Sequence, residues 1–169
     1  MNERVELEDG GAGAPMDVLG QVFDAHGWTW SRDGEDEIIA TARGAWAHVE
    51  LRGIWRGDDG VLQFLALPDI RVPADKRAAM YETLGLVNEG MWLGHWELWS
   101  ASGILALRHA LMLDTDEDGA LADLMAEDLV QAALDECERY YPVFQFVLWG
   151  DKSPADALAA AMVDTAGEA

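Results

Sequence analysis

The first regular pattern along the chain is a stripe of apolar residues at helical spacing behind Pro15. Val18, Val22 and Phe23 fall on one side of a helical projection, and Gly27 follows shortly after them. Proline is well tolerated in the first turn of a helix, and glycine is common just beyond a helix end. The pattern therefore predicts a short amphipathic helix that begins at Pro15 and stops at Gly27.

Beyond this helix, apolar and polar residues alternate in short runs separated by turn residues. Such alternation is typical of antiparallel strands. The pattern predicts a meander of three or four strands, at residues 28–32, 37–42, 46–55 and 61–67. Two more strands are predicted at residues 94–99 and 104–113, joined by a turn that ends at Gly103.

Helical spacing returns in three later segments. A helix that opens at residues 72–75 carries four apolar residues at spacings of 4, 3 and 4. These residues are Met80, Leu84, Val87 and Met91. The longest pattern spans residues 121–149, and its apolar stripe keeps one phase across Pro142, which predicts a bend there rather than an end. Ser153 is a favourable N-cap and predicts a last helix to about residue 163.

The order of elements is helix, strands, helix, two strands, long helix and short helix. We expect a single α+β domain, in which the helices pack on an antiparallel sheet of five or six strands. Residues 1–14 contain four acidic residues and a glycine-rich run, with little apolar surface, and predict a flexible acidic leader. The domain is expected to span residues 15–165.

The register of the predicted hairpin at residues 94–113 decides which side chains share a face. In one register His95 faces His109, and in the other it faces Arg108. A shift of one residue moves every side chain to the opposite face. We favour the second register because it aligns Trp96 with the leucine-rich side of the next strand.

Charge limits the classes of partner. The chain has 11 Lys and Arg residues against 32 Asp and Glu residues, a net charge of −21. This field repels nucleic acid and anionic lipid, so neither nucleic acid nor a membrane is expected as a partner. The sequence has no apolar run of membrane-spanning length and no signal peptide at its start, so a cytoplasmic location is expected.

Motifs of catalysis and of metal binding are incomplete in this sequence. Residues 114–119 resemble the first half of an EF-hand calcium loop, but Met125 stands where the loop needs a bidentate glutamate. Cys137 is the only cysteine and lies on the apolar stripe of the longest helix. No pair among the four histidines has the spacing that places two imidazoles on one helix face. We therefore predict neither an enzyme nor a bound metal or cofactor.

Tryptophan is the most informative residue type. The chain contains eight of them, more than one core of this size needs, and tryptophan suits binding surfaces because it combines apolar area with a polar N–H. A core that buries all eight is an equally open reading. Seven residues form the predicted interaction surface: Trp46, Trp55, Trp96, Trp99, His95, Glu97 and Arg108. We expect a homodimer whose contact lies on the sheet, around the first three of these residues.

Three stretches carry a resemblance to a known family. They are Leu86-Val-Asn-Glu-Gly-Met-Trp-Leu-Gly-His-Trp-Glu-Leu98, Gly103-Ile-Leu-Ala-Leu-Arg-His-Ala-Leu111 and Glu138-Arg-Tyr-Tyr-Pro-Val-Phe-Gln-Phe146. With them the chain resembles the YbjN family of bacterial proteins. The resemblance implies the fold of type III secretion chaperones, assembly as homodimers, and a role as a regulator of sensory transduction or stress.

Two classes of function remain in view. The first is a non-catalytic regulatory or chaperone-like module that binds another protein through exposed aromatic surface. The alternative is a small-ligand sensor or an enzyme with a pocket lined by Trp residues and by His95, Glu97 and Arg108. A deep pocket with converging polar groups is required by the second class only.

Overall fold

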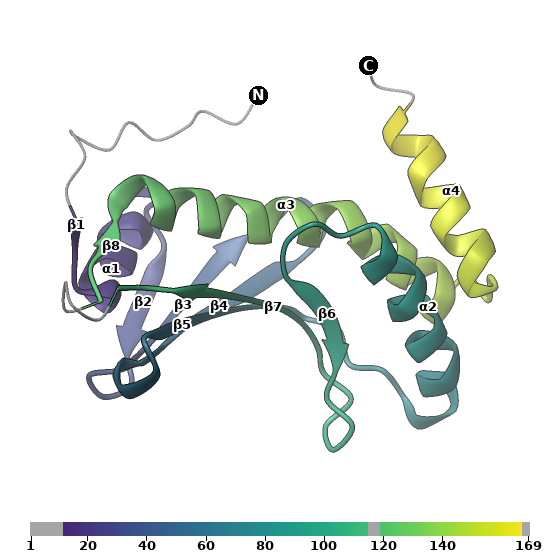
Figure 1. Ribbon diagram of the computed structural model, residues 1–169. Helices are drawn as coiled ribbons and strands as arrows, with labels where there is room; N and C mark the ends of the chain where they lie inside the picture. The colour runs from purple at the N-terminus through teal and green to yellow at the C-terminus, as the bar shows by residue number, and fades with distance from the viewer. Residues whose placement is uncertain (1–11, 115–118, 167–169) are drawn as a thin grey trace.

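A six-stranded antiparallel sheet in the order β2-β3-β4-β5-β7-β6 forms the centre of the protein (Figure 1). The computed structural model describes residues 12–114 and 119–166. The strands are β2 (Thr29–Arg32), β3 (Glu37–Arg43), β4 (His48–Arg56), β5 (Val61–Pro68), β6 (His95–Leu98) and β7 (Leu105–Met112). The predicted α+β class and the sheet of five or six antiparallel strands are confirmed.

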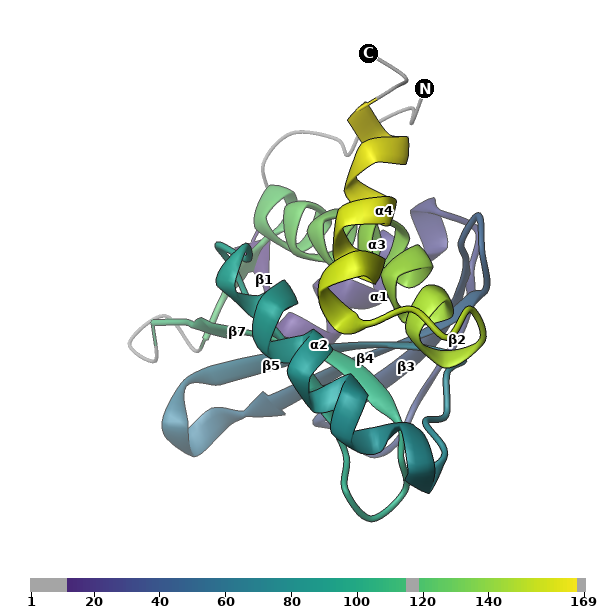
Figure 2. The same cartoon turned by 90° about the vertical axis from the view of Figure 1, so that its right-hand side faces the viewer.

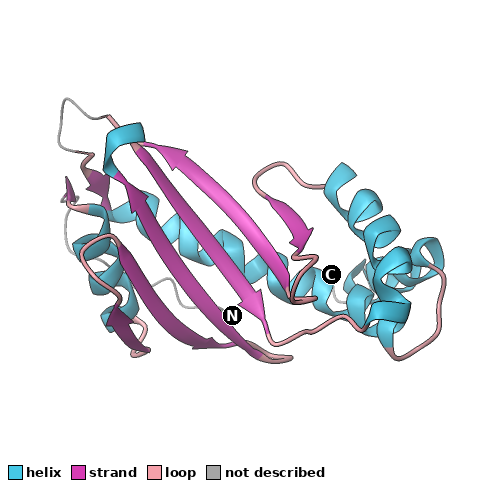
Figure 3. Cartoon of the chain, turned by 90° about the horizontal axis from the view of Figure 1, so that it is seen from below, coloured by secondary structure: helices cyan, strands magenta, loops and turns pink. Residues whose placement is uncertain are grey.

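The helices lie on one face of the sheet and at one end of it. They are α1 (Pro15–Ala25), α2 (Arg77–Glu89), α3 (Asp123–Leu148) and α4 (Pro154–Ala166), and short 3-10 turns occupy Gly57–Asp59 and Ala74–Lys76. Figures 1 and 2 show α3 crossing the sheet, with α2 and α4 together at one end. Seen from the other side, the sheet is uncovered (Figure 3). We call these two sides the helix face and the outer face.

α3 runs without interruption from Asp123 to Leu148, with Pro142 inside it. This confirms that the helix continues through the proline. The phase of its apolar stripe is the reason, because Val130, Cys137 and Phe144 all point into one core.

A second, two-stranded sheet was not predicted. Ala12–Gly13 form β1, which pairs with β8 (Leu121–Ala122) just before α3. The expected flexible leader of residues 1–14 is therefore wrong at its last residues, and residues 1–11 lie outside the described part. The pairing joins the start of the described chain to the start of α3.

The core lies between the sheet and α1 and α3. Alternate sheet residues fill it, and the Trp96 ring meets the Phe144 ring of α3 edge to face with centroids 4.8 Å apart. Gly53 on β4 leaves room for α1, because a Cβ there would lie 2.5 Å from Cδ1 of Leu19. The absence of a side chain at Gly53 thus allows α1 to approach the sheet this closely.

The hairpin register is the one in which His95 faces Arg108, and Trp96 faces Leu107. The prediction is confirmed, together with its reason, since Trp96 and Leu107 are both buried on the helix face. His95 and His109 consequently point to opposite faces of the sheet.

Two glycine substitutions test this packing. Gly53→Ala should lower the free energy of unfolding by about 1–3 kcal/mol, because the added methyl group overpacks the contact with Leu19. Gly85→Ala, in α2, meets no atom within 4 Å. It should raise the free energy of unfolding by about 0.5–1 kcal/mol through the better helix propensity of alanine. Urea denaturation measures both, and equal midpoints for the two variants would contradict the close approach of α1.

Candidate functional site

The seven residues of the predicted surface are divided between the two faces of the sheet. His95, Glu97, Trp99 and Arg108 lie together on or beside the outer face. The other three, Trp46, Trp55 and Trp96, lie on the helix face or at its border. The structure therefore brings together the four residues from the hairpin and separates them from the others.

The outer-face group is a cross-strand network centred on Glu97. The Arg108 guanidinium donates to the Glu97 carboxylate from Nε and from Nη2, the latter at 2.7 Å, and donates from Nη1 to Oε1 of Gln63 at 2.8 Å. The indole Nε1 of Trp99 also donates to Glu97 Oε1, at 2.7 Å. His95 Nε2 lies 3.3 Å from the second carboxylate oxygen. The donors of Arg108 are thus largely engaged within the protein.

The electrostatics of Glu97 result from two opposing effects. Partial burial raises the pKa of its carboxyl group, while the hydrogen bonds from Arg108 and Trp99 and the charge of Arg108 lower it. The pKa ends below its ordinary value. Glu97 is therefore a stable anion that holds the edge hairpin to its neighbours.

Trp96 is a core residue, and its assignment to an interaction surface was wrong. Only 2% of its surface is exposed, because it faces Phe144 of α3. Trp55 also points to the helix face, where it is half-buried and lies against Gly119. A contact between protein copies around these two residues would require the helices to move away.

Trp46 lies in the turn between β3 and β4 rather than within the predicted strand. It is 55% exposed and stacks on Tyr141 of α3 with ring centroids 6.4 Å apart. The same turn is tied to α3 by Glu138, whose Oε1 accepts a hydrogen bond from the Ala45 N–H at 2.6 Å. Trp46 is thus a surface aromatic residue held in a fixed place.

The outer face has a small apolar cluster of its own. Leu65, which is 3% exposed, lies in the sheet register between Arg52 and Arg108. The long stems of these arginines cover it, while their charges pair with glutamates of the same face. A hollow of about 390 Å³ beside the cluster is lined in part by Arg71 and Trp99.

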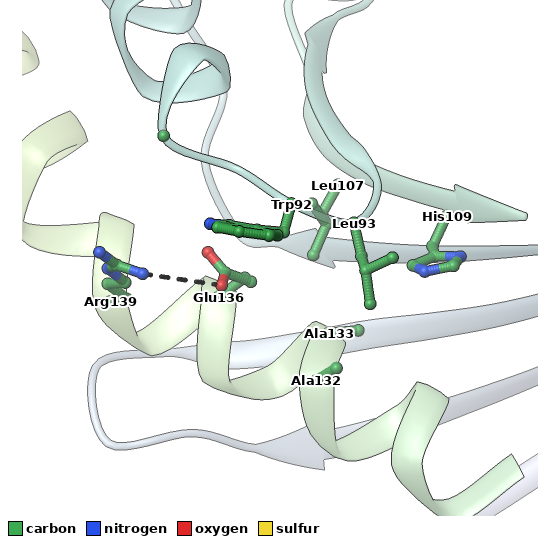
Figure 4. A pocket seen from close by; sticks show the side chains of 9 residues that line it. Trp92, Leu93, Leu107, His109, Ala132, Ala133, Glu136 and Arg139 are labelled. Atoms are coloured by element: carbon green, nitrogen blue, oxygen red, sulfur yellow. Dashed lines mark ion pairs between the residues drawn. The ribbon is translucent and has the colours of Figure 1, made fainter. Parts of the chain in front are cut away.

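The most exposed aromatic residue is one that the sequence analysis did not select. Trp92, in the connection between α2 and β6, is 98% exposed, and Leu93 next to it is 64% exposed. They border a pocket of about 120 Å³ that also contacts His109 of β7 and Glu136 of α3 (Figure 4). The sequence signal that could have identified them is a run of large apolar residues, Met91-Trp92-Leu93, in a short connection between a helix and a strand. A short connection has few neighbours that could bury such side chains, so exposure is expected.

The thiol of Cys137 is buried, and burial raises its pKa far above the ordinary value, so it is not an available nucleophile. Within residues 12–114 and 119–166, no three His, Cys, Asp or Glu residues gather in a way that could hold a metal ion. Most of the EF-hand-like loop, residues 115–118, lies outside the described residues. In the described helices, no segment has both the length and the apolar character needed to cross a membrane.

The fold is that of an α+β protein with one helix-covered and one polar sheet face. Residues 15–146 match the YbjN family, whose description is "Putative bacterial sensory transduction regulator". The chain belongs to the YbjN family, and this membership supports a regulatory role.

A solved structure shares the fold. The "Crystal structure of YbjN, a putative transcription regulator from E. coli" is similar with a TM-score of 0.51 at 12% sequence identity, over 72% of this chain and 84% of that chain. None of the curated proteins compared with this chain matches it.

Removal of Arg108 tests the outer-face network. Arg108→Leu should lower the free energy of unfolding at neutral pH by about 1–2 kcal/mol, because the half-buried Glu97 anion loses its main donor. Because the pKa of Glu97 is lower in the folded protein than in the unfolded chain, the ionised carboxylate stabilises the fold at pH values above its ordinary pKa. This contribution to the free energy of unfolding is lost as the pH falls through the pKa of Glu97 in the folded protein. The difference between the variant and the unmodified protein should therefore shrink in acid.

Urea denaturation over a pH series measures the effect. Arg56→Leu is the matched control, since Arg56 pairs with Asp59 at an exposed position and its loss should cost less than about 1 kcal/mol. Equal losses for the two variants at neutral pH would show that the network does not contribute more than a surface ion pair.

Proposed function

We propose that this protein is a non-catalytic regulator that acts by binding another polypeptide, in a chaperone-like manner. The main observation in support of this proposal is the exposure of Trp92 and Leu93 in the connection between α2 and β6. Exposed aromatic residues at a fixed position are typical of protein interfaces. Membership of the YbjN family supports the regulatory part of the proposal.

Two hollows of the described surface are better suited to a polypeptide than to a small ligand. The larger, on the outer face, includes Arg52, but this arginine is engaged by Glu50 at 2.6 Å and Glu37 at 3.5 Å. The smaller holds about 120 Å³, below the size of ordinary small-molecule sites. A sensor or enzyme would need free polar groups that converge on a deeper cavity.

Photo-crosslinking in the native cell tests this function. A photoreactive residue at Leu93, Trp46 or Trp149, all exposed, should give a discrete adduct with a second protein. The same residue at Asp33, in the exposed turn between β2 and β3, serves as the control. The partner identified from the adduct should then bind the purified chain. Adduct levels at all three positions equal to those at Asp33 would contradict protein binding.

We also propose that the protein forms a homodimer through the outer face. Five of the eleven Lys and Arg residues of the chain lie on this face or at its border, where the acidic residues roughly balance them. They are Arg43, Arg52, Arg56, Arg71 and Arg108. Two copies with a net charge of −21 each repel least where their surfaces are locally neutral. The outer face meets this condition better than α3, whose sequence has six acidic residues and one arginine.

Light scattering over a salt series measures this dimer. The dimer should tighten as salt rises, because screening weakens the repulsion between the two negative chains. Arg71→Glu should weaken it, since it adds negative charge to the contact, whereas Lys152→Glu changes the net charge equally on the loop after α3 and should have a smaller effect. A monomer mass at every salt concentration would contradict the dimer.

A further inference from the structure

The edge of the sheet beside the Trp92 pocket is only half covered. β6 pairs with β7 over four residue pairs, and its first residue, His95, lies opposite Arg108. β7 continues to Met112, and Figure 1 shows it running on beyond the beginning of β6. In the described residues, no strand pairs with this part of β7 on the β6 side.

Hydrogen bonds at both ends of β7 show which backbone groups point to the open edge. The carbonyl of Ile104 accepts from Trp99, on the β6 side, while the N–H of Leu113 donates to Gly60, on the β5 side. Alternate residues of a strand point to opposite edges. The N–H and C=O groups of Ala110 and Met112 therefore point to the open edge, where the Ala110 carbonyl already has a hydrogen-bond partner in Nδ1 of His109, at 3.1 Å.

The other half of the same edge is closed by a side chain. Asn88 of α2 donates from Nδ2 to the Trp96 carbonyl at 3.0 Å and accepts from the Trp96 N–H at 2.8 Å. A side-chain amide thus takes the place of a seventh strand along β6. Exposed strand edges are pairing sites for other chains, and proteins usually cover them. In the described residues, the edge of β7 at Ala110 and Met112 has only the contact between His109 Nδ1 and the Ala110 carbonyl, and no side chain that bonds both backbone groups of one residue.

One flank of α3 overhangs this edge. Ala132 and Glu136 line the pocket together with His109 and Leu107 of β7 (Figure 4). Met125 precedes Ala132 by seven residues, two helical turns, and so lies on the same flank. It is about half exposed. A strand added beside β7 would place alternate side chains under this flank.

The pocket offers a carboxylate to a cation at Glu136, beside Arg139, which also lines it. Glu136 has one carboxylate oxygen that is buried without a hydrogen-bond partner, and its other oxygen is 3.9 Å from Arg139, beyond hydrogen-bond distance. The Trp92 ring lies beside the same carboxylate in Figure 4, and aromatic rings attract cations. A net charge of −21 adds a long-range attraction for a basic partner.

From this geometry we infer that the open edge of β7 at Ala110 and Met112 binds an extended, basic and apolar segment of another protein as an added antiparallel strand. A lysine or arginine of that segment enters the pocket between Trp92 and Glu136. The residue opposite Leu111 supplies this side chain, because Gly94 already lies beside His109 and directly paired residues of antiparallel strands point to the same face. The inference rests on the proposed function, whose partner and binding surface it specifies. A second copy of this acidic chain fits the edge poorly.

The experiment measures the binding of a short fluorescein-labelled peptide of alternating valine and lysine to the purified protein by fluorescence anisotropy. A peptide with glutamate in place of lysine should bind much more weakly. Two further peptides carry N-methyl groups on alternate backbone nitrogens, in opposite phases. One phase should abolish binding and the other should preserve it, because only one set of N–H groups faces β7.

Variants of the protein locate the site. Glu136→Gln should weaken binding of the lysine peptide roughly fivefold, the effect of about 1 kcal/mol, whereas Glu82→Gln, an equal charge change on α2, should leave it unchanged. Trp92→Ala should weaken binding, and Trp149→Ala, another exposed tryptophan, should not. Trp92 contributes little to folding because it is almost fully exposed.

Equal binding of the two N-methylated peptides, or equal effects of each variant and its control, would overturn the edge site. So would a dimer whose amide protection falls on Ala110 and Met112, since a second copy would then occupy the edge. Cross-links to a partner from Trp46 or Trp149 would leave the proposed function standing after such a result. Failure of all the cross-links would instead contradict the function itself.

Discussion

The contact between α3 and one face of the sheet determines the rest of the structure. Phe144 of α3 packs against Trp96 of β6, and Glu138 and Tyr141 hold the turn that carries Trp46. At its other end α3 is tied to α1 by Glu127, a buried carboxylate that accepts a hydrogen bond from His26 at 2.9 Å. A single helix therefore contacts the β6 edge of the sheet, the turn between β3 and β4 and the end of α1, and it leaves the opposite face to be covered by side chains alone.

Three residues in the stretches that carry the family resemblance have clear structural roles. Asn88, in the first of the three stretches, closes the edge of β6 by bonding both backbone groups of Trp96. Gly94 turns the chain into β6 with a positive φ of 69°, and a Cβ there would lie 2.7 Å from the Arg108 carbonyl oxygen. Glu138, in the third stretch, anchors the turn before β4. These residues position the edge hairpin and a turn, and none of the three has a free group directed into a cavity.

The sequence was sufficient for the helices and most strands because their ends carry proline, glycine or a change of period. It was sufficient for the hairpin register because Trp96 needs apolar neighbours. It could not show which sheet face the helices cover, since Leu65 on the outer face is as buried as residues of the core. The surface role given to Trp96 failed for this reason. β1 and β8 were missed because two-residue strands are too short to show a period.

Coverage of the sheet also explains why its open edge lies where it does. Arg52 and Arg108 make the outer face polar by pairing with glutamates, so that face needs no helix. Asn88 closes the edge of β6 within reach of α2, but α2 ends at Glu89 and cannot extend along β7. The next cover available to β7 is the flank of α3, which contributes two alanines, an arginine and a weakly paired glutamate rather than a capping amide. The exposed Trp92 lies at this junction, where the intramolecular cover of the edge stops and another chain can continue it.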